Sequence, residues 1–162
     1  MEPNTQKLSP QEAMEQWFSR LEQPDHPASG RGVMKLLEPR FVSCDHEKRE
    51  VCLAFKALEW ELNPGGSLHG GIIMTCFDMT FGLTCYYYCD QHMVTTVNMS
   101  TTFLKPILLG DVVKYHVKIT SLGRTLISMT AEGWLHRNGK DVLAATATAT
   151  FMKLDKKLEK DI

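Results

Sequence analysis

One segment constrains the fold of this chain more than any other, the apolar stretch from Gly70 to Cys89. A helix that is apolar around most of its circumference must be surrounded by protein. Because the stretch also holds a carboxylate, Asp78, and several threonines, it favours a buried core helix over a membrane span. The sequence therefore predicts a long central helix from His69 to about Tyr87 and no membrane partner.

The segments on both sides of this helix have the pattern of β-strands. Upstream, the pattern is extended from Val33, and residues 41–44 lead through a polar turn into a strand over 51–60. Downstream, Asn138-Gly139 is a strong signal for a two-residue hairpin. We expect an antiparallel meander of four strands there, over 94–104, 111–120, 125–136 and 141–154. One long helix wrapped by an antiparallel sheet is an α+β fold.

The amino-terminal part predicts a separate helix. Ser9-Pro10-Gln11-Glu12 is a capping box with proline at the first helical position. We expect this helix to end near Gln23-Pro24, with a loop over 25–32 that contains the breakers Pro27, Ser29 and Gly30. The expected division is an N-terminal helix and loop (1–32), one main domain (33–154) and a charged, frayed tail (155–162).

Composition excludes several classes of protein. With 162 residues and 43% hydrophobic residues, the chain has enough apolar mass for one domain. A formal net charge of -1 argues against a nucleic-acid partner. The five cysteines form no Cys-x-x-Cys pair, the six histidines lack metal-ligand spacing, and no secretory signal precedes them. We therefore expect a cytoplasmic protein with reduced cysteines and no metal or cofactor.

Two features of the central helix could carry chemistry. Asp78 lies in its middle, where a carboxylate is costly unless it is partnered or has a shifted pKa. It would act as a general base or nucleophile, or else only face a groove or cap a strand. His69-Gly70-Gly71 opens the same helix, so unobstructed N–H groups could bind an oxyanion there. Alternatively, the glycines only permit a tight turn.

These residues belong to a longer pattern. It resembles that of the hotdog-fold thioesterases of the phenylacetyl-CoA thioesterase and thioesterase-superfamily-member-2 type. The resemblance extends over about residues 33–153 and leaves out the N-terminal helix. The matching positions are Asn63, His69-Gly70-Gly71, Asp78, Thr96, Phe103-Leu104-Lys105-Pro106 and Gly110-Asp111.

The resemblance implies a role for each matching residue. The Gly70 N–H, with Asn63 nearby, would polarise the thioester carbonyl, and His69 would position the thioester. Asp78 of the partner subunit would activate water or attack directly, while Thr96 would orient that water. For Lys105 and Arg124, the alternative to a contact with CoA is that they are ordinary solvated charges. The substrate-binding positions, most of them along the CoA arm, would be Gly71, Phe103, Lys105, Ser121, Gly123, Arg124 and Thr125.

The implied function is hydrolysis of an aromatic or short-to-medium acyl-CoA, in a homodimer that is doubled to a homotetramer. Two alternatives stay open, since a fold does not dictate a function. One is an acyl-CoA or small-ligand binding protein without catalysis. The other is a thioesterase for acyl-carrier-protein substrates, although the near-neutral charge offers no basic docking surface for an acidic carrier.

Overall fold

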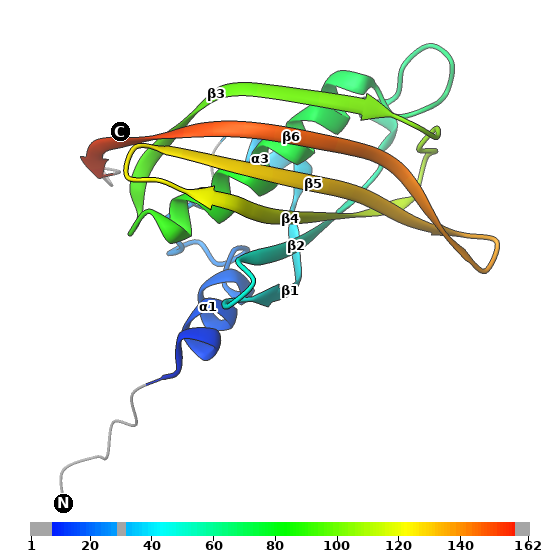
Figure 1. Ribbon diagram of the computed structural model, residues 1–162. Coiled ribbons are helices and arrows are strands. Elements are labelled where there is room, and N and C mark those ends of the chain that lie inside the picture. Colours follow the sequence, from blue (N-terminus) through cyan, green and yellow to red (C-terminus); the bar gives the residue numbers. More distant parts are fainter. Residues whose placement is uncertain (1–7, 29–31, 158–162) are drawn as a thin grey trace, which may run out of the picture.

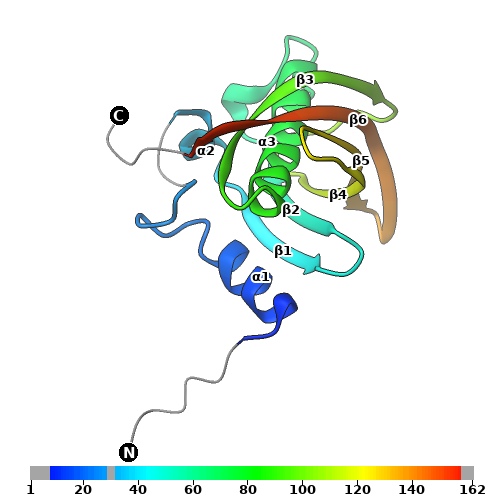
Figure 2. The same cartoon turned by 60° about the vertical axis from the view of Figure 1, so that its left-hand side comes forward.

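The computed structural model describes residues 8–28 and 32–157. Its main feature is one six-stranded antiparallel sheet that curves around a long helix (Figures 1 and 2). The predicted central helix is confirmed, because α3 runs from Gly70 to Tyr88. The strands are β1 (Arg40–Asp45), β2 (Glu50–Lys56), β3 (His92–Phe103), β4 (Val112–Leu122), β5 (Leu126–Arg137) and β6 (Lys140–Lys157).

The core lies between α3 and the sheet. Phe77 and Phe81 of α3 are fully buried. The ring of Phe77 stands edge-on to that of Tyr115 in β4, with centroids 4.7 Å apart, and Phe81 faces Phe151 in β6. Gly133 in β5 lies against the same rings, and a Cβ there would be in ordinary van der Waals contact with Phe77, at 3.4 Å. In the described part of the chain, no helix is long and apolar enough to cross a membrane.

The strand order corrects the predicted meander. The sheet has the order β1-β2-β4-β5-β6-β3, so β4 pairs with β2, and β3 pairs with β6 at the far edge. The reason is the long helix, which separates β3 from the hairpin before it and returns the chain beside the last strand. Only β4, β5 and β6 form a meander. Its last turn is the predicted hairpin, with Asn138 and Gly139 both at positive φ.

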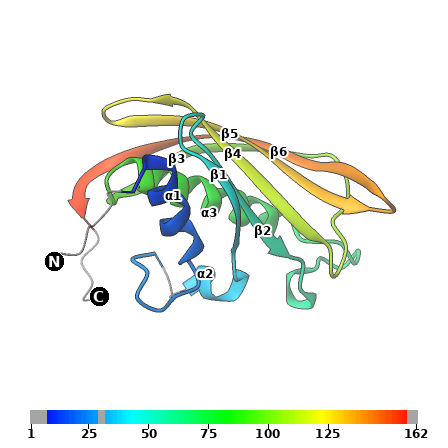
Figure 3. The ribbon, with the colours of Figure 1, turned by 90° about the horizontal axis from the view of Figure 1, so that it is seen from below.

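The two edges of the sheet differ. Helix α1 (Pro10–Ser19) starts with the predicted capping box and lies against β1 (Figure 3). Its Gln11 side chain donates to the Cys44 carbonyl at 2.9 Å and accepts from the His46 N–H at 2.7 Å. The Gln11 side chain thereby satisfies two backbone hydrogen-bonding groups at the end of β1. The other edge, twelve-residue β3, has β6 as its only strand partner among the described residues.

Several predicted boundaries were wrong. Residues Gly32–Leu37 form a short helix, α2, instead of a strand, and Pro39 follows directly after it. Strand β2 ends at Lys56, and the chain then makes the 3₁₀ turn η1 (Glu59–Glu61). Helix α1 ends at Ser19, before Gln23-Pro24, while β6 extends into the expected tail as far as Lys157. The predicted breakers at 29 and 30 and the tail beyond 157 lie outside the described residues.

All five cysteines are free, and four of them are buried, as their apolar surroundings predicted. Two of these, Cys76 and Cys85, belong to the buried side of α3. They contribute to the core as small apolar side chains.

Candidate active site at the amino end of the central helix

The start of α3 leaves one backbone donor available. His69 is the N-cap, and its Nδ1 accepts from the Gly71 N–H at 3.0 Å. The N–H groups of Ile72 and Ile73 donate to the His69 carbonyl. The Gly70 N–H donates to no acceptor within the described residues. It therefore points its hydrogen out of the positive end of a helix, where an anionic oxygen is stabilised.

The two glycines allow this helix end to close tightly. A Cβ on residue 71 would lie 3.2 Å from His69 Nδ1 and would crowd the cap. A Cβ on residue 70 would lie 3.3 Å from the ring of Phe103. That ring, half exposed at the end of β3, forms a wall beside the Gly70 N–H. Because Nδ1 is an acceptor, a neutral His69 carries its hydrogen on Nε2.

Asn63 shapes the loop that leads into the helix. Its Oδ1 accepts from the N–H groups of Gly65 at 2.9 Å and Ser67 at 3.3 Å. Its Nδ2 donates to the Ser67 hydroxyl at 3.0 Å. Asn63 therefore organises the turn, and these contacts do not direct its amide at Gly70. Its predicted part in polarising a carbonyl stays a prediction.

Glu61 is a residue of this region that the sequence patterns did not single out. It is 3% exposed, and burial raises the pKa of its carboxyl. Its Oε2 accepts from the Leu58 N–H at 2.8 Å, while its backbone carbonyl accepts from the His69 N–H at 2.9 Å. Glu61 thus connects the η1 turn to the N-cap of α3. The only signal in the sequence was a carboxylate three residues after Leu58, the spacing of a capping box.

Asp78 lies two turns further along α3 with a partner on β3. Its Oδ1 accepts from the Thr96 hydroxyl at 2.6 Å. Asp78 is half buried and Thr96 is exposed, so the pair lies at the open side of the helix. Asp78 is the eighth residue after Gly70, which is about 12 Å along a helix axis. One protomer therefore does not bring both groups onto one small acyl carbon.

The predicted substrate-binding residues fall into two groups at opposite ends of the sheet (Figure 1). Phe103 ends β3 and Lys105 follows it, on the side of Gly70 and Gly71. The turn between β4 and β5 lies beside the last part of β6, where the backbone N–H of Lys153 donates to the Thr125 carbonyl. The predicted residues there are exposed, namely Ser121 near the end of β4 and Gly123, Arg124 and Thr125 in the turn. A single protomer does not join the two groups.

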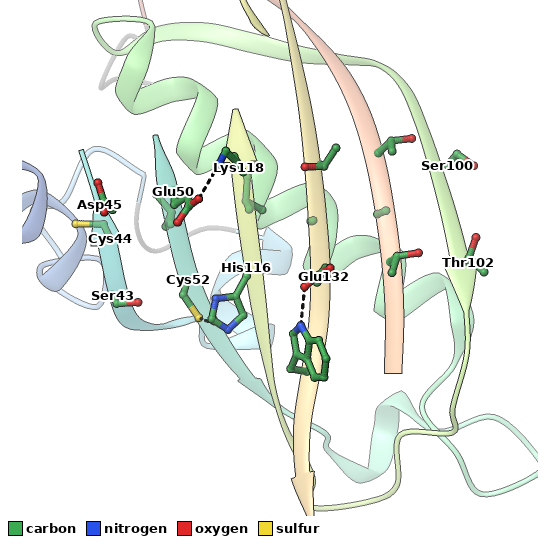
Figure 4. Close-up of a pocket in the computed structure, with 18 residues that line it drawn as sticks. Ser43, Cys44, Asp45, Glu50, Cys52, Ser100, Thr102, His116, Lys118 and Glu132 are labelled. Carbon is green, nitrogen blue, oxygen red and sulfur yellow. Dashed lines mark hydrogen bonds and ion pairs between the residues drawn. The ribbon is translucent and has the colours of Figure 1, made fainter. Parts of the chain in front are cut away.

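A hollow lies on the face of the sheet turned away from α3 (Figure 4). Its volume is about 690 Å³, and polar and apolar groups contribute about equally to its lining. In it, Cys52 Sγ is 3.5 Å from His116 Nε2, and Lys118 pairs with Glu50. Burial raises the pKa of Cys52 to about 11 and lowers the pKa of His116. The pair therefore stays a thiol and a neutral imidazole at neutral pH, which is not the state of a cysteine nucleophile.

The chain is similar in sequence and in fold to known thioesterases. The model of the Thioesterase superfamily matches residues 65–142, which hold α3, Asp78 and Thr96. The acyl-coenzyme A thioesterase THEM4 of Rattus norvegicus is 35% identical over 111 residues, or 67% of this chain and 45% of that protein. This chain thus spans less than half of the rat relative.

A bacterial relative and a solved structure agree. The acyl-CoA thioester hydrolase YciA of Salmonella typhimurium is 27% identical over 101 residues, or 62% of this chain and 76% of that protein. A phenylacetic acid degradation-related protein of Ralstonia eutropha JMP134 superposes with a TM-score of 0.69. It is 26% identical, and the match covers 84% of this chain and 98% of that one. Residues 65–142 are therefore similar to the Thioesterase superfamily, and the chain has the hotdog fold of its structural neighbours.

Proposed function

We propose that this protein hydrolyses acyl-CoA thioesters, at sites formed between two protomers. The observation that carries the proposal is the free Gly70 N–H at the amino end of α3, together with the Asp78–Thr96 pair on the open side of the same helix. Relatives in rat and Salmonella that are named acyl-CoA thioesterase and acyl-CoA thioester hydrolase support it.

The chemistry needs only these groups. The thioester carbonyl oxygen accepts from the Gly70 N–H, which stabilises the negative charge that develops there. Asp78 removes a proton from water as the water attacks the carbonyl carbon. Alternatively, Asp78 attacks that carbon itself, and water then hydrolyses the resulting mixed anhydride to the free acid and restores the carboxylate. In both routes the C–S bond breaks, and CoA leaves as a thiol once its sulfur has taken a proton. Thr96, which donates to one Asp78 oxygen, holds the carboxylate in one orientation.

Two protomers can bring together a Gly70 and an Asp78, which lie too far apart within one protomer. The α3 residues that are not fully buried include Gly71, Met74, Thr75 and Asp78, a stripe of helical spacing. If two α3 helices lie antiparallel across a two-fold axis near Met74, Gly70 of each faces Asp78 of the other. The outer edge of β3 pairs with no strand in the described part of the chain, and it is the edge through which two sheets can join. We infer such a homodimer, doubled to a homotetramer.

The acyl group is aromatic or of short to medium length. The similarity to a phenylacetic acid degradation-related protein favours the aromatic class. In the proposed dimer, the exposed cations Lys105 and Arg124 come from the two ends of the sheet and are candidates for the CoA phosphates. Phe103 would contact the acyl-thioester end, since its ring lies against Gly70.

Turnover of a panel of acyl-CoA thioesters tests the proposal. The purified chain should release free thiol from phenylacetyl-CoA or hexanoyl-CoA. Asp78→Asn should lower kcat by about a hundredfold or more, because the amide is no base or nucleophile, and should still bind CoA. Asp141→Asn is the matched control, since Asp141 is an exposed carboxylate on β6. Full activity of Asp78→Asn, or no turnover across the panel, would contradict the proposal.

A further inference from the structure

The carboxyl end of α3 holds two thiols side by side. Cys85 and Cys89 are one helical turn apart, and their sulfur atoms are 3.9 Å from each other. Cys85 is 0% exposed and Cys89 is 3% exposed. Burial raises the pKa of both thiols, so both are protonated at neutral pH. The pair lies about two turns beyond Asp78, and the proposed hydrolysis does not use it.

We propose that Cys85 and Cys89 form a dithiol site for trivalent arsenicals, in which one arsenic atom bridges the two sulfurs. With an arsenoso compound, R–As=O, the two S–H groups are converted to two As–S bonds. The arsenic oxygen leaves as water with the two thiol hydrogens, and no atom is oxidised or reduced. The site is independent of the proposed thioesterase site.

Geometry favours a bridging atom over a disulfide. On a helix, Cβ atoms four residues apart are about 5–6 Å from each other. A disulfide needs about 3.5–4.5 Å between Cβ atoms and about 2.05 Å between sulfurs. The Cys85 and Cys89 sulfurs, 3.9 Å apart, would have to move together by nearly half that distance. By contrast, two bonds to one bridging atom, each of about 2.3 Å as between zinc and a thiolate, span most of the 3.9 Å, so the sulfurs need to approach only slightly.

The number and charge of the ligands select arsenic over a metal ion. A structural zinc ion takes four protein ligands. Among the described residues, no three His, Cys, Asp or Glu side chains could hold a metal together. A monovalent soft ion between two thiolates would leave a net negative charge in a buried site, which is costly. Trivalent arsenic brings its own third substituent and forms a neutral product.

Entry to the site requires the end of the helix to open. The chain leaves α3 through Asp90 and Gln91, which have φ of 52° and 58°. Non-glycine residues adopt this left-handed region uncommonly, and here two adjacent ones do. The ends of helices also fray more readily than their centres. Binding should therefore be slow and limited by local opening, without unfolding of the whole chain.

Phenylarsine oxide tests the site on the native full-length chain. After treatment and a wash with excess monothiol, intact mass should rise by one phenylarsenic group less two hydrogens. Thiol titration in denaturant should fall from five to three thiols. A dithiol reagent should reverse both changes. Retention of the adduct should vanish in Cys85→Ala and in Cys89→Ala, because a single As–S bond exchanges with monothiol.

Cys52→Ala is the matched control, since Cys52 is also buried but lies on the other face of the sheet, and it should keep the adduct. If Cys85→Ala fails to fold, Cys89→Ala at the C-cap decides alone. A wild-type chain that keeps all five thiols would overturn the proposal, and so would an adduct that survives in Cys89→Ala.

Discussion

The hydrogen bonds at the start of α3 leave one backbone N–H group, that of Gly70, without an acceptor among the described residues. Nδ1 of His69 accepts from the Gly71 N–H, and the His69 carbonyl accepts from the N–H groups of Ile72 and Ile73. Only the Gly70 N–H stays open to a substrate oxygen. Proline at position 70 would delete that N–H and still suit the first helical position. The preceding residue, His69, already has the extended conformation that proline requires of it.

The Thr96 hydroxyl gives the most specific prediction at this scale. Thr96→Val keeps the shape but removes the donor to Asp78. Hydrogen bonds to charged groups contribute about 1.5–3 kcal/mol. We therefore expect kcat for an acyl-CoA to fall about tenfold to a hundredfold, with little change in KM.

Thr96→Ser is the control, because it keeps the hydroxyl and loses only a methyl group. It should stay within a few-fold of the wild-type kcat. Equal losses in the valine and serine variants would mean that the methyl group, and not the hydrogen bond to Asp78, matters.

Much of this site could be predicted from single residues. A lone carboxylate in an apolar helix and a His-Gly-Gly helix start are local patterns, and both occur where expected. The use of Asn63 could not be foreseen, because its amide bonds to Ser67 in a turn whose geometry the sequence does not state. Glu61 was missed for a related reason, since its burial depends on the packing of β2 and η1.

At the scale of elements, η1 and α3 are joined through Glu61. Its carboxylate closes the 3₁₀ turn, and its backbone holds the His69 N–H. A buried carboxyl with a raised pKa binds its proton more tightly in the folded state than in the unfolded state. Its contribution to stability is therefore complete below the ordinary pKa of 4.5 and is lost as pH rises through the folded pKa.

Glu61→Gln should remove this dependence. The glutamine keeps an oxygen that can accept from the Leu58 N–H, but it has no charge to bury. Urea unfolding of both proteins from pH 4.5 to neutral pH measures the effect. The midpoint of the variant should rise relative to that of the wild type as the pH rises. A constant difference across this range would show that Glu61 is not held with a raised pKa.

The order of the strands was the part of the fold that local patterns could not supply. Alternation marks each strand, and turn residues mark the Asn138-Gly139 hairpin, so neighbours joined by tight turns were predicted correctly. Strand β3 has no tight turn on either side, because α3 precedes it and the loop to β4 follows. Its pairing with β6 depends on which face of the sheet the helix crosses.

At the scale of the whole molecule, the distribution of the site residues points to an assembly. Gly70 and Phe103 lie at one end of the sheet, and Arg124 lies at the other. Helix α1 covers β1, while β3 pairs with β6 alone among the described residues. The proposed two-fold dimer through β3 would bring opposite ends of two sheets together. The same proposed dimer would close the gap of about 12 Å between Gly70 and Asp78.

Mixed dimers test this account most directly. Asp78→Asn and Gly70→Pro chains with different tags are coexpressed, and the dimers that carry both tags are isolated. Each parent should be nearly inactive, whereas the mixed dimer joins an intact Gly70 to an intact Asp78 at one of its two sites. It should recover about half of the wild-type turnover per dimer. If mixed dimers form but are no more active than either parent, Gly70 and Asp78 do not serve one site from two protomers.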